Sequence, residues 1–128
     1  METHELTIQQ VATLTGLSVH TLRYYERIGL LHPVGRAANS HRRYATADVE
    51  WLQFLTRLRA TGMSIRLMQQ YADLRRQGDA TLHERRQLLE IHQREVQARI
   101  DELQRSMSVI IKKINHYKEL ETADRGDG

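Results

Sequence analysis

Residues 18–31 read SVHTLRYYERIGLL, and the order of polar and apolar residues in this stretch predicts a short helix. Ser18 is a good N-cap, because its hydroxyl can accept a hydrogen bond from an N–H group of the first turn. Leu22 follows on the inward face, and Ile28 with Gly29 marks the point where a helix would stop. The stretch therefore predicts a helix that starts after Ser18 and ends at Gly29.

The residues just upstream predict another short helix. Thr7 and Gln10 have the spacing of a capping box. One face of this helix is formed by Ile8, Val11, Ala12 and Thr15, and Gly16 stands where the helix would end and the chain turn. Two short helices joined by a glycine-containing turn form a helix-turn-helix pattern, which occurs in DNA-binding proteins and also in other helical hairpins.

The outward face of the second helix is rich in groups that bind phosphate. His20, Arg23, Tyr24 and Arg27 recur at i, i+3, i+4 and i+7, so they form one stripe. Such a stripe suits a DNA groove, whose edges are lined by phosphates. The residues alone leave a plainer interpretation open, namely a solvated helix face with a tyrosine leaning on the core.

The helical period is lost across residues 31–45, where Pro33 interrupts the pattern. Asn39-Ser40 indicates a turn between two short segments and hence a small β-hairpin. The basic residues of this segment are Arg36, Arg42 and Arg43. A basic hairpin after such a helix is typical of a wing that contacts the DNA backbone or the adjacent minor groove, although an ordinary solvent loop is the alternative.

Two further helices complete the predicted first domain. Thr46-Ala47-Asp48 begins a third helix, with a cap and an acidic residue in its first turn. Ser64 caps a fourth helix, and Arg66 lies in the first turn of that helix, a place suited to a phosphate contact. We therefore expect residues 6–78 to form one compact DNA-binding domain.

The remaining segment predicts a coiled coil. Residues 82–117 contain neither Pro nor Gly, and Thr81 with Glu84 has capping-box spacing at their start. The apolar residues with heptad spacing are Leu82, Leu89, Val96, Ile100, Leu103, Met107, Ile110, Ile114 and Tyr117. A chain this small cannot cover such a stripe alone, so we expect a homodimer built on residues 79–118, with parallel and antiparallel pairing both open. Residues 119–128 are polar and are expected to be a disordered tail.

The composition limits the possible functions. The chain has 128 residues, a formal net charge of +3 and no cysteine, which excludes disulfides and thiolate metal sites. Residues 1–78 carry ten Arg against six acidic residues, so the basic excess lies in the expected DNA-binding domain. No apolar run could cross a bilayer and residues 1–5 are not a signal peptide, so we expect a cytoplasmic protein. The seven histidines are scattered, and we expect no metal, no cofactor and no enzymatic activity.

The run from Thr21 to Leu31, TLRYYERIGLL, resembles the recognition-helix signature of the MerR family of transcription regulators. Other stretches agree in order and spacing: residues 8–18 resemble the first helix and turn, residues 39–44 the wing, and residues 58–65 the junction between the third and fourth helices. The resemblance covers about residues 6–117, which is nearly the whole chain.

The resemblance implies a mainly all-α fold, with a winged helix-turn-helix followed by a long helix that pairs antiparallel with its copy. The implied DNA contacts are Ser18, His20, Thr21, Arg23, Tyr24, Tyr25, Arg27, Arg36, Arg42, Arg43, Tyr44 and Arg66. A dimer of this kind would bind a pseudo-palindromic site in double-stranded promoter DNA. It would activate transcription by bending and untwisting the spacer, so that RNA polymerase meets the two promoter elements in register.

The sequence departs from the family pattern in two ways. Ser40 stands where the wing turn commonly has glycine, and the cysteines of the metal- and electrophile-sensing relatives are missing, so their chemistry does not carry over. An architectural or excisionase-like DNA-binding protein without an effector is the main alternative function, and a coiled-coil adaptor that ignores DNA is another. The effector, the operator sequence and the target genes are not encoded in any recognisable motif.

Overall fold

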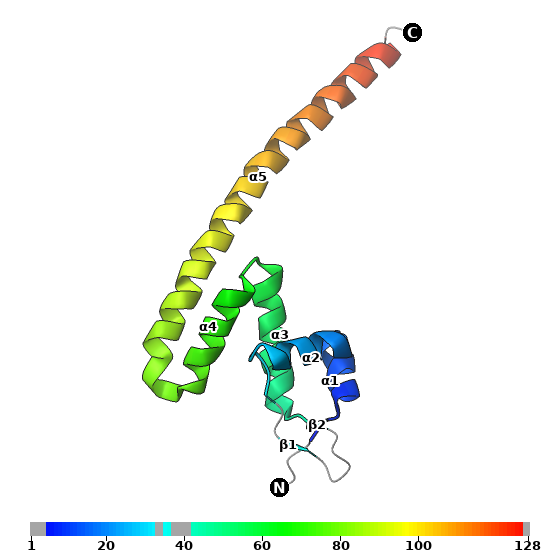
Figure 1. Ribbon diagram of the computed structural model, residues 1–128. Coiled ribbons are helices and arrows are strands. Elements are labelled where there is room, and N and C mark those ends of the chain that lie inside the picture. The colour runs from blue at the N-terminus through cyan, green and yellow to red at the C-terminus, as the bar shows by residue number, and fades with distance from the viewer. Residues whose placement is uncertain (1–4, 33–34, 37–41, 127–128) are drawn as a thin grey trace. The chain divides into compact units, whose positions relative to one another are not determined.

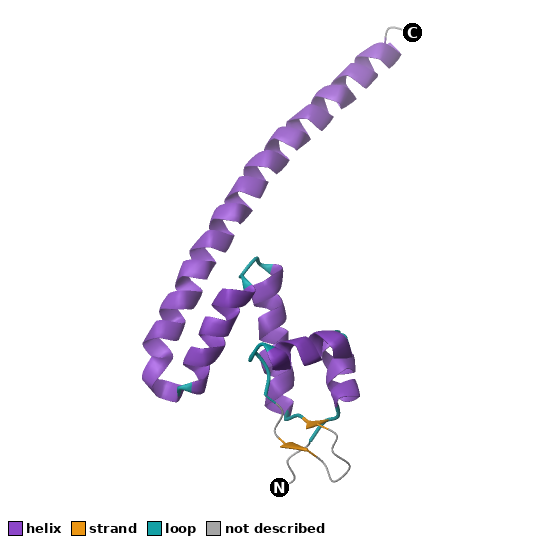
Figure 2. Ribbon diagram, in the orientation of Figure 1, coloured by secondary structure: helices purple, strands orange, loops and turns teal. Residues whose placement is uncertain are grey.

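The computed structural model describes residues 5–32, 35–36 and 42–126, and the chain is mainly helical, as the sequence predicts (Figures 1 and 2). It divides into two units, Met1–Leu88 and Leu89–Gly128. The elements in chain order are α1 (Ile8–Thr15), α2 (Val19–Arg27), β1 (Gly35–Arg36), β2 (Arg42–Arg43), α3 (Thr46–Ala60), α4 (Ile65–Arg76), the 3-10 turn η1 (Gly78–Thr81) and α5 (Leu82–Gly126).

The predicted helix-turn-helix is present, and its caps are those expected. The Thr7 N–H donates to Gln10 Oε1 (2.8 Å) and the Gln10 N–H donates to Thr7 Oγ1 (3.2 Å), which completes the capping box of α1. Gly16 ends α1 in the left-handed region (φ 75°), where its N–H donates to the Ala12 carbonyl (2.9 Å). This conformation costs a residue with a Cβ more than it costs glycine, so Gly16 suits the turn into α2.

The two short strands pair antiparallel, with Gly35 opposite Arg43 and Arg36 opposite Arg42. The turn predicted at Asn39-Ser40 lies outside the described residues, so that turn stays a prediction. A bridge between Leu6 and Tyr44 continues the pairing, because each residue donates its N–H to the carbonyl of the other, at 2.7 and 2.9 Å. The start of the chain is thereby tied to the residue that follows β2.

The core of the first unit lies between the helices. α1 packs against α2 and α3, and α3 packs against α4. The buried apolar residues are Val11, Leu22, Tyr25, Leu30, Leu31, Tyr44, Val49, Trp51, Leu52, Leu55, Leu58, Met63, Met68 and Ala72. α3 differs from its prediction at one end: its N-cap is Ala45, and Thr46 is its first helical residue. The Asp48 carboxylate takes over the capping role by accepting a bond from the Ala45 N–H (2.8 Å).

The predicted capping box at Thr81 is wrong. Thr81 is buried, and its hydroxyl donates to the carbonyls of Leu74 and Gly78, which lie at the end of α4 and in η1. Arg85 adds bonds from Nε to Thr81 Oγ1 (3.2 Å) and from Nη2 to the Gly78 carbonyl (2.9 Å). The hydroxyl therefore binds carbonyls at the end of α4 and in η1, and not the N–H groups of α5.

The long helix extends further than predicted. α5 runs to Gly126, so the described part of the expected tail, residues 119–126, is helical. At 1.5 Å per residue its 45 residues span roughly 68 Å. The nine apolar residues with heptad spacing form the predicted seam of the coiled coil. Seven of them are exposed in the single chain, and Leu89 and Val96 are half-buried. Within residues 5–32, 35–36 and 42–126, no helix combines the length and apolarity needed to cross a membrane.

Candidate nucleic-acid interface

The predicted stripe on α2 is fully displayed at the surface. His20, Arg23, Tyr24 and Arg27 are all exposed, and they lie on the face of α2 opposite the buried Leu22. The Arg27 guanidinium carbon lies 5.8 Å from the centre of the Tyr24 ring, within the range of a cation–π contact. This stripe therefore carries two fixed positive charges, an imidazole and a phenol.

Two residues predicted to contact DNA are buried instead. Tyr25 has 5% of its surface exposed and Tyr44 has none, so neither side chain is available to a ligand at the surface. The Tyr44 hydroxyl donates to the Glu26 carboxylate and so joins the end of β2 to α2. Tyr25 anchors the inner face of α2 in the core, and Tyr44 binds Glu26 of the same helix. Burial therefore argues against the prediction that either side chain contacts DNA directly.

For the other predicted DNA contacts, the structure describes some side chains and, in two cases, the backbone alone. Ser18 is exposed and caps α2, accepting a bond from the Thr21 N–H (3.0 Å), while its own hydroxyl donates to Thr21 Oγ1 (2.9 Å). Arg43 is half-buried, and Arg66 is exposed in the first turn of α4. Only the backbones of Arg36 and Arg42 are described, as members of the strand pair.

The sequence analysis missed a set of residues that hold the C-terminal turn of α2. Trp51 of α3 donates from Nε1 to the Leu30 carbonyl (2.7 Å), and Gln69 of α4 donates from Nε2 to the Ile28 carbonyl (3.0 Å). Arg76, at the end of α4, donates from Nη1 to the Gly29 carbonyl (2.7 Å). The donors lie 21, 41 and 47 residues from their acceptors, so no local spacing in the sequence signals them.

An aromatic cluster joins α3 to α4 behind this turn. Trp51 stacks on Tyr71 with ring centres 5.9 Å apart, and Phe54 lies 5.9 Å from Tyr71. The Arg75 guanidinium carbon lies 4.2 Å from the centre of the Trp51 ring. Because Trp51 also binds the Leu30 carbonyl, the cluster fixes the position of the indole that reaches the end of α2.

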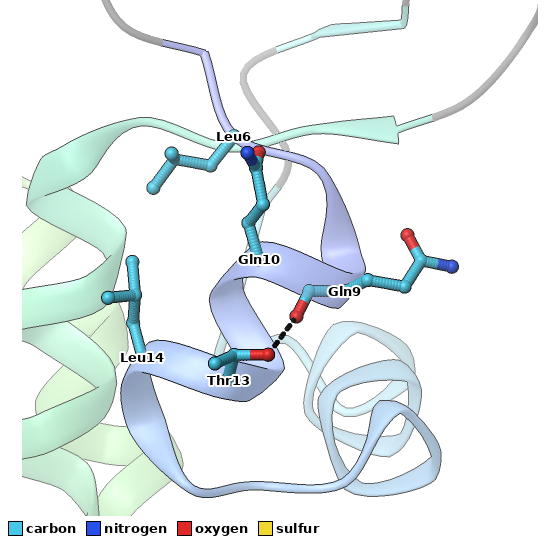
Figure 3. A pocket seen from close by; sticks show the side chains of 5 residues that line it. All are labelled: Leu6, Gln9, Gln10, Thr13 and Leu14. Atoms are coloured by element: carbon cyan, nitrogen blue, oxygen red, sulfur yellow. Dashed lines mark hydrogen bonds between the residues drawn. The ribbon is translucent and has the colours of Figure 1, made fainter.

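A second surface feature lies on α1 and carries no charge. Leu6, Gln9, Gln10, Thr13 and Leu14 line an open hollow there (Figure 3), and the Thr13 hydroxyl is occupied by a bond to the Gln9 carbonyl (3.0 Å). In the part of the chain that the structure describes, no three His, Asp or Glu side chains come together as a possible metal site. Of these surfaces, the α2 stripe has the chemistry that suits a polyanion.

The chain matches two descriptions of one protein family. Residues 6–74 match the MerR HTH family of regulatory proteins, and residues 49–112 match the MerR family segment described as DNA binding. An uncharacterised HTH-type transcriptional regulator of Haemophilus influenzae is 36% identical over 112 residues, which are 88% of this chain and 83% of the relative.

Solved structures agree with these matches. HiNmlR, a MerR family regulator that lacks the sensor domain and was crystallised bound to promoter DNA, superposes with a TM-score of 0.81 and 34% identity over 93% of this chain and 94% of its own. A MerR family structure from Listeria monocytogenes gives a TM-score of 0.83 and 35% identity over 88% and 86%. All three relatives are described as regulators. The chain belongs to the MerR family of helix-turn-helix transcription regulators.

Proposed function

We propose that this protein is a homodimeric transcription regulator that reads double-stranded promoter DNA with α2. The observation that carries the proposal is the exposed stripe of His20, Arg23, Tyr24 and Arg27 on a short helix whose opposite face is buried. An α-helix fits the major groove of B-form DNA, and arginine can bind either guanine or phosphate with two hydrogen bonds. The DNA-bound state of the related HiNmlR supports the same use of the fold.

The other proposed contacts surround this helix. Arg43, and with it Arg36 and Arg42, would meet the DNA backbone beside the groove that α2 enters, and Arg66 would meet phosphate from the start of α4. Backbone contacts of this kind fix the register of a protein on DNA, whereas base contacts from the recognition helix carry the sequence information.

The dimer is proposed from the exposed apolar face of α5. Ile100, Leu103, Met107, Ile110 and Ile114 recur with heptad spacing and are all exposed in the single chain. A second copy covers this face most simply, because a two-fold dimer lets the same stripe serve both chains. We propose antiparallel pairing of the two α5 helices, as the family resemblance implies, with two copies of α2 acting on a pseudo-palindromic site.

For the regulatory step we propose activation by deformation of the promoter. The dimer would bend and untwist the spacer between the two promoter elements, so that RNA polymerase, which the regulator need not touch, finds both elements on the same face of the duplex. Bending a site of this length costs on the order of several kcal/mol, which the protein–DNA contacts must supply.

The salt dependence of binding tests the assignment of α2. The probe is a duplex that the wild-type protein has selected from a random-sequence pool, and the variant is Arg23→Gln. If Arg23 contacts phosphate in both subunits, the slope of log K against log salt should become shallower by roughly 1.8, which is about 0.9 for each lost contact. Arg105→Gln is the matched control, because it removes one positive charge from an exposed arginine on α5.

The outcomes separate the candidate functions. An unchanged slope for Arg23→Gln, or the same change for Arg105→Gln, would remove Arg23 from the interface. A wild-type protein that selects no duplex at low salt would refute DNA binding altogether. In vitro transcription from a promoter that carries the selected site then distinguishes an activator, which raises transcript yield, from an architectural protein, which bends the duplex without raising it.

A further inference from the structure

The C-terminal turn of α2 is held by a row of side-chain donors. The carbonyls of Ile28, Gly29 and Leu30 are consecutive, and each accepts a hydrogen bond from a side chain of α3 or α4, at 3.0, 2.7 and 2.7 Å. The last carbonyls of a helix and of its C-cap have no partner within the helix. Here long side chains from other helices supply those partners, so the turn is fixed in position as well as satisfied.

Arg76 makes the most contacts of the three donors. Its guanidinium donates to the Gly29 carbonyl (2.7 Å), reaches His32 Nε2 (2.7 Å) and pairs with the Asp73 carboxylate one turn earlier on α4. Because the guanidinium is planar and rigid, partners on several sides fix both its position and its orientation. Its positive charge also lies at the C-terminal end of α2, where the helix dipole favours a cation.

The short length of α2 makes these contacts important. α2 has nine residues, too few for a helix to be stable or oriented by its own hydrogen bonds. Leu22 and Tyr25 hold its inner face in the core, and the Tyr44 hydroxyl holds Glu26. These contacts lie near the middle of the helix, so its tilt depends on contacts at its ends. The bonds from Gln69 and Arg76 fix the C-terminal end against α4.

We propose that Arg76, assisted by Gln69, is a positioning residue for sequence recognition: by holding the Ile28 and Gly29 carbonyls it sets the angle at which α2 enters the DNA groove. This inference rests on the proposed function. Hydrogen bonds to base edges depend steeply on distance and angle, so they weaken when a donor moves by up to about 1 Å. Attraction to phosphate tolerates such a shift. Loss of Arg76 should therefore weaken discrimination between sequences more than it weakens attachment to DNA.

The test compares Arg76→Met with Arg59→Met. Both variants lose one positive charge from the first unit, but Arg76 binds the turn after α2, whereas Arg59 is an exposed residue of α3. Affinity is measured for the selected duplex and for a random duplex of equal length, over a range of salt concentrations. For Arg76→Met we expect roughly tenfold or greater loss on the selected duplex, the effect of about one charge-assisted hydrogen bond, and less than about twofold loss on the random duplex.

The salt slope distinguishes positioning from direct contact. Since 43% of the Arg76 side chain is exposed, Arg76 could itself meet a phosphate. In that case the slope would become shallower by roughly 1.8 for the dimer and affinity would fall on both duplexes, which would overturn the proposal. Positioning requires an unchanged slope, and equal losses for Arg59→Met and Arg76→Met would also overturn it.

A milder variant covers the case in which Arg76→Met does not fold, as judged by far-UV circular dichroism. Arg76→Lys keeps the charge, but an ammonium group cannot reach Gly29, His32 and Asp73 with the same geometry. Positioning predicts that Arg76→Lys folds and still loses discrimination, whereas wild-type discrimination in this variant would show that charge alone matters and would refute the proposal. If the wild-type protein binds no duplex, the proposed function fails independently of Arg76.

Discussion

The substitution Leu103→Glu tests the α5 seam most directly. Leu103 is 70% exposed in the single chain, so most of its surface is available for burial against a second copy. Complete burial of a leucine side chain stabilises by about 1.5–3 kcal/mol. Because the proposed dimer contains Leu103 twice, loss of both buried leucines costs the dimer roughly 3 kcal/mol. Two carboxylates without partners at the seam add on the order of 2 kcal/mol. The dissociation constant of the dimer should rise by roughly 10³-fold or more.

Sedimentation velocity across a wide concentration range measures this change, with Ala98→Glu as the control. Ala98 is exposed and lies five residues before Leu103, which places it roughly 140° away around the helix. The control therefore adds the same charge to α5 outside the seam. We expect a monomer for Leu103→Glu and a dimer for Ala98→Glu. A dimer for both variants at every concentration would refute the seam assignment, and far-UV circular dichroism establishes that the helices persist.

Two further predictions concern the supports of α2. Trp51→Phe leaves the buried Leu30 carbonyl without its donor and should lower the free energy of unfolding by about 1–3 kcal/mol, measured by urea titration with far-UV circular dichroism because Trp51 is the sole tryptophan. A change below about 0.5 kcal/mol, which is typical of a surface substitution, would show that the bond from Trp51 to the Leu30 carbonyl contributes little to stability. Tyr44→Phe removes the bond to the Glu26 carboxylate and should cost about 1–2 kcal/mol in the same titration, and equal stability of the variant would argue against the bond in solution.

The helix ends of the first unit were largely predictable from the sequence. Thr7, Gly16, Ser18 and Ser64 act as expected because a helix cap depends on residues within about four positions of it. Thr81 was mispredicted for a related reason. A threonine can serve the helix on either side of it, and the Leu74 carbonyl seven residues earlier takes its hydroxyl here.

The buried tyrosines show where local reasoning fails. Tyr44 pairs through its backbone with Leu6 and through its hydroxyl with Glu26, and both partners are remote in the sequence. A tyrosine within a run of basic residues resembles a DNA contact in composition, but only the folded arrangement determines whether the ring points to solvent or to the core. Burial of a phenol requires a hydrogen-bond partner, and the carboxylate of Glu26 provides it.

The end of α5 differs from its prediction, because polar residues can continue a helix as well as form a disordered tail. Residues 118–125 read KELETADR, and most of these residues favour helix. A helix already formed extends at little cost through good helix formers, since each added residue gains a hydrogen bond without a new nucleation step. Gly126 is the first glycine after Gly78, and the described helix ends there.

The proposed recognition surface and its proposed support are encoded at different distances along the chain. The stripe of His20, Arg23, Tyr24 and Arg27 follows from one helical period. The bonds proposed to orient this stripe come from Trp51, Gln69 and Arg76, as many as 47 residues away from their acceptors. Two proteins with the same α2 sequence but different residues at positions 69 and 76 should therefore prefer different DNA sequences. Grafting α2 of this protein onto a relative that lacks these donors should transfer its affinity for phosphate but not its full sequence preference, because the groups that contact the bases would be present at a different angle.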